Sequence, residues 1–311
     1  VLQELIRQGK ELDFVKEKFE SLQDKSQVLE ELVRQGKELD FVKEKFNDLE
    51  NKYKSQVLQE LVRQGKELDF VKENFDELNG EYEKSKAFQE LIRQGKELDF
   101  VKSKFDGLYY GDEKSKVLQE LIRQGKELDF VKEKFESLQD KDKSQVLEEL
   151  VRQGKKLEFV LKNVRYIQYE ETKKKVREQA QQRGISEKKI EWQFNPNVDK
   201  LLEIIDEDIE FVKSKFDGLY YGDEKSQVLQ ELVRQGKELE FVKEKFESLV
   251  GKDKYQVLQE LVRQGEELDF VKSKFDELND LYEKSQVLQE LVRQGEELDF
   301  VKSKFDELND E

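Results

Sequence analysis

The most restrictive feature of the chain is a unit that recurs with a period of 27 to 30 residues, apart from one gap of 52 residues. One copy, SQVLQELVRQGKELEFVKEKFESL (226–249), returns with small changes, and nine copies carry a glycine after Arg-Gln. A further copy at 201–216 has Asp206 in the place of this glycine. A period of this length predicts supersecondary units that each bury their apolar face against the next unit.

The apolar residues of this copy recur at helical spacing. Taken as one helix, most of them form a near-heptad stripe, but Leu229, Val233 and Phe241 point elsewhere. Taken as two helices that meet at Gly236, each half has an apolar face of its own. Because the second arrangement exposes fewer apolar side chains, we favour a helical hairpin and keep one straight helix as the alternative.

The residues around the glycine also suit a corner. Glycine is preferred just beyond a helix C-terminus, where the chain turns through a left-handed conformation. Arg234 precedes the glycine while Glu238 and Glu240 follow it, which suits the dipoles of the two helix ends. Ser226 is a candidate N-cap, and connectors such as YYGDEK (220–225) are predicted to be turns. The predicted corner residues are Gly36, Gly65, Gly95, Gly125, Gly154, Gly236, Gly265 and Gly295.

The sequence therefore predicts an all-α fold of tandem helical hairpins that stack into an α-solenoid or rod. Six copies occupy 1–164 and four occupy 197–311, with an insertion at 165–196 between them. The spaced signatures of tetratricopeptide, ankyrin and armadillo repeats are absent from the sequence, so the pattern indicates a class of fold and no family.

The insertion at 165–196 differs from the repeat in pattern and in charge. Short stretches of alternating residues at 165–169 and 189–194 predict two strands. The pattern between them predicts a helix from Glu170 to Arg183 with Gly184 at its C-terminal cap, which makes the segment a small β-α-β element. Eight basic against five acidic residues give this segment a charge of +3 in a chain of −16. We expect it to contact an acidic partner surface, with a solvated insertion as the alternative. The candidate contact residues are Lys173, Lys174, Lys175, Arg177 and Trp192.

Composition restricts the chemistry. The chain has no Cys, His or Met, which removes thiolate and imidazole metal ligands and the usual nucleophiles. No phosphate-binding glycine loop or hydrolase motif is present, so we expect no enzymatic activity and no cofactor. The net charge of −16 argues against a nucleic-acid partner, and no apolar run is long enough to span a membrane. The compartment stays open.

The terminal copies at 1–19 and 287–305 have the same apolar positions as the interior copies. Soluble solenoids usually end in atypical repeats with a polar outer face, so these copies predict exposed apolar ends. We therefore expect a structural protein that associates with copies of itself end to end. The alternatives are a fragment of a longer array and a scaffold that binds other proteins. One phenylalanine per copy, Phe241 in the quoted one, is expected in the core, or else in a partner groove.

Overall fold

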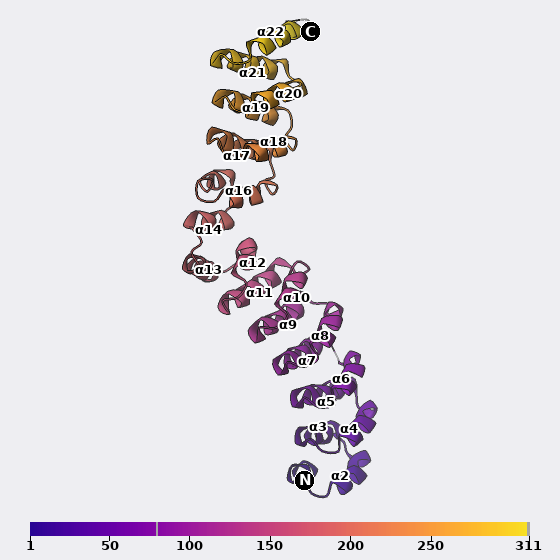
Figure 1. Cartoon of the computed structure of the whole chain (residues 1–311). Helices are drawn as coiled ribbons and strands as arrows, with labels where there is room; N and C mark the ends of the chain where they lie inside the picture. The colour runs from indigo at the N-terminus through magenta and orange to yellow at the C-terminus, as the bar shows by residue number, and fades with distance from the viewer. Residues whose placement is uncertain (79, 310–311) are drawn as a thin grey trace. The chain divides into compact units, whose positions relative to one another are not determined.

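The computed structural model describes residues 1–78 and 80–309, and all regular structure in these residues is helical. The fold is a series of helical hairpins of the α-solenoid class, as predicted (Figure 1). The chain divides into two compact units, Val1–Arg183 and Gly184–Glu311. None of the described helices combines the length and the apolar character needed to cross a bilayer.

Unit 1 contains thirteen α-helices among its described residues. The first helix of each hairpin is the longer one from the second hairpin onward, and a short 3₁₀ turn follows many of the second helices, at 19–21, 46–48, 75–77, 105–107 and 164–166. The bounds are α1 Leu2–Gln8, α2 Leu12–Lys18, α3 Lys25–Gln35, α4 Leu39–Lys45, α5 Asn51–Gln64, α6 Leu68–Glu73, α7 Glu81–Gln94, α8 Leu98–Lys104, α9 Gly111–Gln124, α10 Leu128–Phe135, α11 Asp140–Arg152, α12 Leu157–Lys162 and α13 Glu170–Gln182.

Unit 2 contains nine α-helices among its described residues, with one 3₁₀ turn at Phe275–Glu277. The bounds are α14 Glu187–Phe194, α15 Val198–Leu202, α16 Ile209–Phe216, α17 Gly222–Arg234, α18 Leu239–Phe246, α19 Lys252–Gln264, α20 Leu268–Lys274, α21 Leu281–Gln294 and α22 Leu298–Asn309.

The glycine of each repeat turns the corner between two helices, so the hairpin prediction is confirmed and the straight helix is wrong. In α9–α10 the glycine, Gly125, has φ +67°, and its N–H donates to the Ile122 carbonyl while Lys126 N–H donates to the Leu121 carbonyl. This pair of bonds is the Schellman closure of a helix C-terminus. All eight predicted corner glycines have φ between +60° and +75°.

The core of each unit runs along the inside of the stack. The first helices of successive hairpins pack side by side, for example α7 on α9 and α17 on α19. Leu229 and Val233 of α17 are buried completely, although they lay outside the stripe of a straight helix. Phe241 is half-buried and packs against this core. Each half of the hairpin therefore buries a face of its own.

The long helices begin earlier than the sequence indicated, so the N-cap prediction for Ser226 is wrong. Helix α17 starts at Gly222, and Ser226 is buried in its second turn, where its hydroxyl contacts the Asp253 carbonyl at 3.3 Å and Gln256 Oε1 at 3.1 Å. The predicted turn at 220–225 is therefore mostly the first turn of a helix. The contacts to the next repeat stabilise this extension because they satisfy a polar side chain inside the stack.

The insertion contains no strand among its residues, so the β-α-β prediction is wrong. The segment at 165–169 is a 3₁₀ turn followed by extended chain, and 189–194 lies within helix α14. Ser186 caps α14 by accepting a hydrogen bond from Lys189 N–H, which favours helix over strand in a short alternating segment. The helix predicted from Glu170 is confirmed as α13, and Gly184 follows it with φ +75°.

The two helices of the insertion keep the core positions of a degenerate repeat. Gly184 lies 30 residues after Gly154, which is the ordinary period. Val176 and Ala180 of α13 and Ile190 of α14 are buried and stand at the same distances from Gly184 as Val228, Leu232 and Val242 from Gly236. In unit 1, α13 packs on α11 and α12, in the place of a next first helix.

Candidate functional site

The junction between successive repeats is held by a line of ion pairs near the corners. The second residue after each corner glycine, usually Glu, has φ near +50°, a conformation that costs an L-residue about 1–2 kcal/mol. In seven junctions this Glu meets a Lys of the preceding repeat at 2.8–3.2 Å, in the pairs Lys16–Glu38, Lys43–Glu67, Lys72–Glu97, Lys102–Glu127, Lys213–Glu238, Lys243–Glu267 and Lys272–Glu297. Hydrogen bonds to Asp269 and Glu297 raise the pKa of Lys272, so it stays charged.

A junction where the Glu is replaced keeps its charge balance. Lys156 stands at the position of this Glu in the sixth repeat, also with φ +51°. Its ammonium group lies 3.5 Å from Asp129 of the preceding repeat, which reverses the direction of the pair. The position after the corner therefore accepts either sign of charge when the preceding repeat supplies the opposite one.

A second line of ion pairs runs between the first helices. Six junctions join an Arg to a Glu of the next repeat at 3.1–4.0 Å, in the pairs Arg7–Glu31, Arg34–Glu60, Arg93–Glu120, Arg123–Glu149, Arg234–Glu260 and Arg263–Glu290. Burial alone would raise the pKa of Glu31, but the Gln35 hydrogen bond and the charges of Arg7 and Arg34 outweigh it and lower this pKa. Glu31 therefore remains ionised inside its junction.

Aromatic pairs join the second helices of successive hairpins. The buried Phe that ends one second helix meets the edge or face of a Phe in the next second helix, with ring centroids 5.0–5.4 Å apart and planes 78–87° apart. Edge-to-face pairs at this spacing add to the stabilisation by burial. The predicted phenylalanine series thus lies at the junctions, with members such as Phe41 and Phe241 half-buried.

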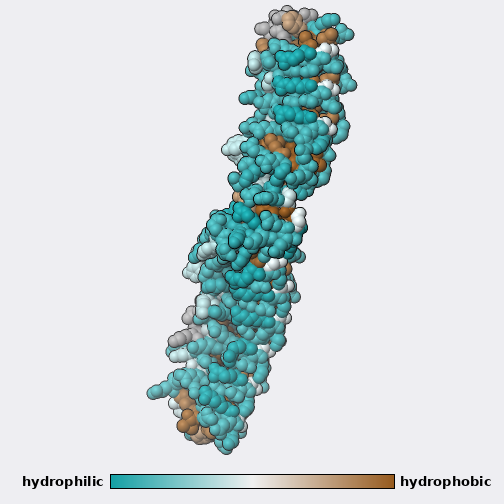
Figure 2. Space-filling model, turned by 90° about the vertical axis from the view of Figure 1, so that its left-hand side faces the viewer, coloured by the Kyte–Doolittle hydropathy of each residue, from teal (hydrophilic) through white to brown (hydrophobic). Residues whose placement is uncertain are grey.

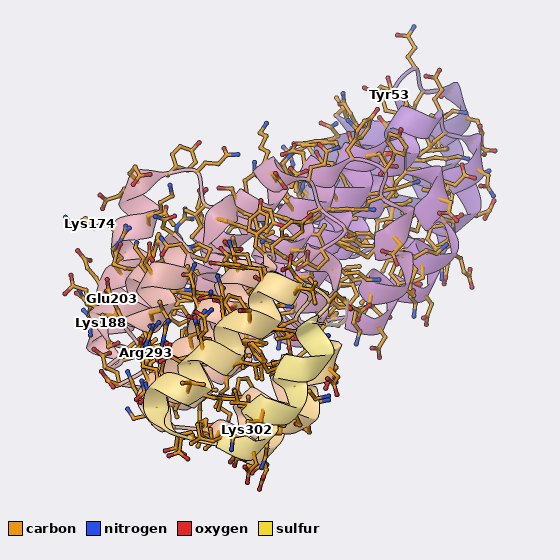
Figure 3. The ribbon with its side chains drawn as sticks, turned by 90° about the horizontal axis from the view of Figure 1, so that it is seen from above. Tyr53, Lys174, Lys188, Glu203, Arg293 and Lys302 are labelled. Carbon is orange, nitrogen blue, oxygen red and sulfur yellow. The ribbon has the colours of Figure 1, made fainter. Side chains whose placement is uncertain are left out.

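The last repeat presents the same junction groups on an exposed surface. Val292 is 53% exposed and Phe305 is 58% exposed, whereas their counterparts Val262 and Phe275 are 0% and 1% exposed. These two residues line a hollow of about 680 Å³ between α21 and α22. Arg293 and Lys302 lie on the same two helices, which Figure 3 shows side by side in yellow, and both side chains are exposed.

The first repeat presents the opposite half of a junction. Phe14 is exposed, while Phe300, its counterpart in the last repeat, is half-buried. Glu4 is exposed and pairs with Arg7 of its own helix, and Glu11 has φ +52°. Figure 2 shows hydrophobic surface at the end that carries the N-terminus and at the end that carries the C-terminus. The first repeat therefore has an acidic and apolar outer face.

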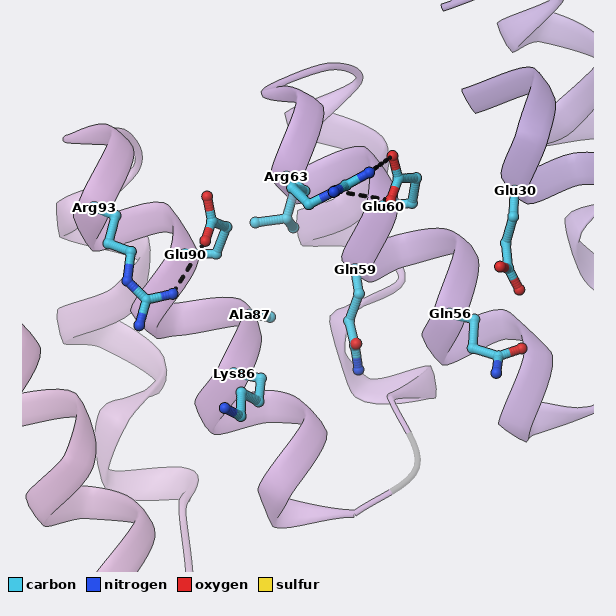
Figure 4. A pocket seen from close by; sticks show the side chains of 10 residues that line it. Glu30, Gln56, Gln59, Glu60, Arg63, Lys86, Ala87, Glu90 and Arg93 are labelled. Atoms are coloured by element: carbon cyan, nitrogen blue, oxygen red, sulfur yellow. Dashed lines mark hydrogen bonds and ion pairs between the residues drawn. The ribbon is translucent and has the colours of Figure 1, made fainter. Parts of the chain in front are cut away.

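A hollow of about 300 Å³ lies on the first helices α3, α5 and α7 (Figure 4). It forms where Ala87 replaces the Val found at 57 and 117. Four of its six charged lining residues are already paired, since Arg63 meets Glu60 at 2.7 Å and Arg93 meets Glu90 at 3.2 Å. This hollow therefore offers little for binding a charged ligand.

The predicted contact residues of the insertion are distributed over both units. Lys173, Lys174 and Lys175 lie on α13 in unit 1, at 2.6, 4.0 and 3.8 Å from Glu170, Glu178 and Glu171 of the same helix, and Arg177 also lies on α13. Trp192 lies on α14 in unit 2, where its ring meets Phe211 edge to face at 5.6 Å and the Lys215 ammonium lies over it at 5.4 Å. Their role in partner contact stays a prediction.

No cluster of His, Cys, Asp or Glu among the described residues suits a metal ion. A comparison with known protein families and with curated proteins finds no match. The junction and the two terminal repeats are therefore the features of the molecule that bear on function. Sequence reasoning identified the apolar ends but missed Arg293, Lys302, Glu4 and Glu11, although their period of about 30 residues was visible.

Proposed function

We propose that this protein is a non-enzymatic structural element that associates with copies of itself end to end. The last repeat of one copy stacks on the first repeat of the next, as the interior repeats stack on one another. The observation that carries this proposal is the exposure of Val292 and Phe305, whose counterparts in the preceding repeat are buried. An exposed apolar hollow at a surface that already has a complementary face elsewhere on the molecule favours open association.

The first experiment is light scattering on a sizing column over a wide range of concentration, with electron microscopy of the same fractions. We expect particles whose mass grows with concentration. Val292→Asp should abolish this growth because it places a carboxylate in the apolar contact. Val250→Asp is the matched control, since Val250 is an exposed valine in a connector. A particle of 37.2 kDa at every concentration would contradict the proposal.

A scaffold for a basic partner is the second candidate function. A hollow of about 530 Å³ on the connector side of unit 1 is lined by Tyr82, Tyr110 and the carboxylates of Glu81, Glu83, Asp112 and Glu113. Glu83 Oε2 and Glu113 Oε2 are buried there without a hydrogen-bond partner, while Lys116 pairs with Asp112 at 2.7 Å. Titration with a lysine-rich peptide, compared between the wild type and Glu83→Gln, tests this function. Equal affinity of the peptide for the wild type and for Glu83→Gln would contradict this second function.

A further inference from the structure

We infer that the contact between copies has one polarity and one register, in which Arg293 and Lys302 of one copy pair with Glu4 and Glu11 of the next. This inference rests on the proposed function, because it requires end-to-end association. It goes further in naming the residues that select the partner surface, and it therefore predicts which altered copies will still recognise one another.

The junction before the last repeat supplies the template. There Arg263 lies 3.6 Å from Glu290, Lys272 lies 3.0 Å from Glu297, and the rings of Phe275 and Phe300 are 5.4 Å apart. Residues 260–280 and 290–310 are identical in sequence. The last repeat therefore carries the same donor half of the junction, with Arg293, Lys302 and Phe305 in the places of Arg263, Lys272 and Phe275.

The first repeat carries the matching acceptor half. Glu4, Glu11 and Phe14 stand at the same distances from Gly9 as Glu290, Glu297 and Phe300 from Gly295. Glu11 already has the left-handed backbone of its counterpart, with φ +52° against +50° at Glu297. The backbone that presents this carboxylate to a Lys of a preceding repeat is thus formed before any contact is made.

The apolar part of the contact also has a counterpart. Leu2 and Leu5 of α1 correspond to Leu288 and Leu291 of α21. The latter two are 4% and 0% exposed, while Leu2 and Leu5 are half-buried in the free chain. Seating α1 against α21 and α22 would place these side chains over the hollow beside Val292. The occupant of this hollow is therefore the first repeat of a second copy.

The charges exclude the two symmetric pairings. Two last repeats would bring Arg293 and Lys302 against their own kind, and two first repeats would do the same with Glu4 and Glu11. Like charges placed opposite one another disfavour an interface, whereas opposite charges fix its register. The remaining arrangement joins unlike ends, and such a heterologous contact can be repeated from copy to copy.

Charge exchange tests this pairing with two variants of the full chain. The first variant is Arg293→Glu with Lys302→Glu, which makes both ends acidic. The second is Glu4→Lys with Glu11→Lys, which makes both ends basic. Lys is compatible with the backbone at position 11, because Lys156 has the same conformation at the equivalent position. Each variant alone should self-associate about tenfold more weakly than the wild type at low salt.

An equimolar mixture of the two variants should associate again, since each acidic last repeat finds a basic first repeat and each wild-type basic last repeat finds a wild-type acidic first repeat. Fluorescent labels of two colours, one on each variant, should then alternate along the particles. The matched control is Lys141→Glu with Lys162→Glu, which changes the net charge as much as the first variant but lies on α11 and α12, where both side chains are exposed. This control should associate like the wild type.

The outcomes separate the inference from the proposed function. If both single variants associate as well as the wild type, or if their mixture fails to associate, the inferred pairing is wrong while end-to-end association stands. If the control on α11 and α12 loses association and the end variants keep it, the contact uses another surface and the inference is overturned. If the wild type does not associate, the proposed function fails together with the inference. Circular dichroism of each variant confirms that its helices are intact.

Discussion

The last two repeats are an internal comparison, because residues 260–280 and 290–310 have the same sequence and different neighbours. Both form the same corner, with φ +68° at Gly265 and +75° at Gly295, and φ near +50° at Glu267 and Glu297. They differ where the next repeat would lie. The second helix stops at Lys274 in one copy and is followed by a 3₁₀ turn, whereas in the other it continues to Asn309.

The difference shows which parts of the hairpin need a neighbour. In the interior copy, Phe275 and Leu278 are each 1% exposed and Leu278 is extended, so the chain leaves the helix to bury both side chains. Phe305, at the equivalent position of the last repeat, is 58% exposed. The corner is thus a local property of the sequence, while the end of the second helix is a property of the junction.

The largest expected effect comes from the aromatic residue that ends each second helix. Phe275→Ala should lower the free energy of unfolding by about 3–5 kcal/mol, because it opens a cavity in a closed junction. Phe305→Ala should cost far less, since more than half of its side chain is already exposed. Chemical denaturation followed by circular dichroism, at a concentration where the chain is monomeric, measures both. Equal losses would show that the last junction is closed in solution.

The corner should respond equally in the two copies. Gly265→Ala and Gly295→Ala should each lower the free energy of unfolding by about 1–2 kcal/mol, because a left-handed conformation opposes a Cβ. Apart from the glycine and its two chain neighbours, no atom lies within 4 Å of a Cβ built at either position, so the expected effect is backbone strain. The same denaturation assay applies. Greater stability in the alanine variants would instead indicate a continuous helix.

A second pair of identical stretches, 100–115 and 211–226, tests the influence of the following repeat. Burial and the charge of Asp112 raise the pKa of Asp142, and burial and the charge of Asp223 raise that of Asp253. The folded state therefore binds these protons more tightly than the unfolded chain, so these carboxyls oppose folding at neutral pH and do so less as the pH falls through their raised pKa values.

Asp142→Asn and Asp253→Asn should therefore both raise the melting temperature at pH 7, by less than the corner glycines lower it. This gain should shrink as the pH is lowered through the raised pKa values of the native carboxyls, which then become protonated. Thermal unfolding at several pH values measures the effect. A gain in melting temperature that does not depend on pH would instead indicate a steric cause, since the carboxylates of Asp142 and Asp253 lie close to Gly111 and Gly222.

The smallest expected effect concerns the ion pairs at the corners. Glu297→Gln removes the partner of Lys272 in the preceding repeat and should destabilise the chain slightly at low salt. Glu11→Gln should change the stability of the monomer less, because the Glu11 side chain is exposed. The difference should vanish at high salt. Thermal unfolding at two ionic strengths measures both variants. A larger loss of stability for Glu11→Gln than for Glu297→Gln would contradict the ion pair at the junction.

Much of the fold could be predicted from residues close together in sequence. Gly236 and the apolar faces on either side of it predicted the hairpin, since helix geometry and left-handed turns depend on a few neighbouring residues. The left-handed Glu238 could not be predicted in this way, because Glu has no preference for that conformation. Its pair with Lys213, at 2.8 Å in the preceding repeat, accompanies the strained turn and can offset part of its cost.

The candidate interface was only partly predictable. The apolar ends followed from the ordinary pattern of 1–19 and 287–305, but the charges that pair across a junction required the distances between repeats. The insertion was misread for a related reason. Its short alternating segments suit strands as well as helices. The second segment forms a helix because Ser186 caps it, the chain turns at Gly184 and Ile190 is buried.

The sequence by itself determined the period, the corner at each glycine and the face that each helix buries, because these depend on backbone preferences over a few residues. The tertiary structure alone decided where the long helices begin, where the second helices end and which charged residues meet. Those features depend on a neighbour about 30 residues away, whose contacts satisfy Ser226 in the interior and leave Val292 and Phe305 exposed at the end.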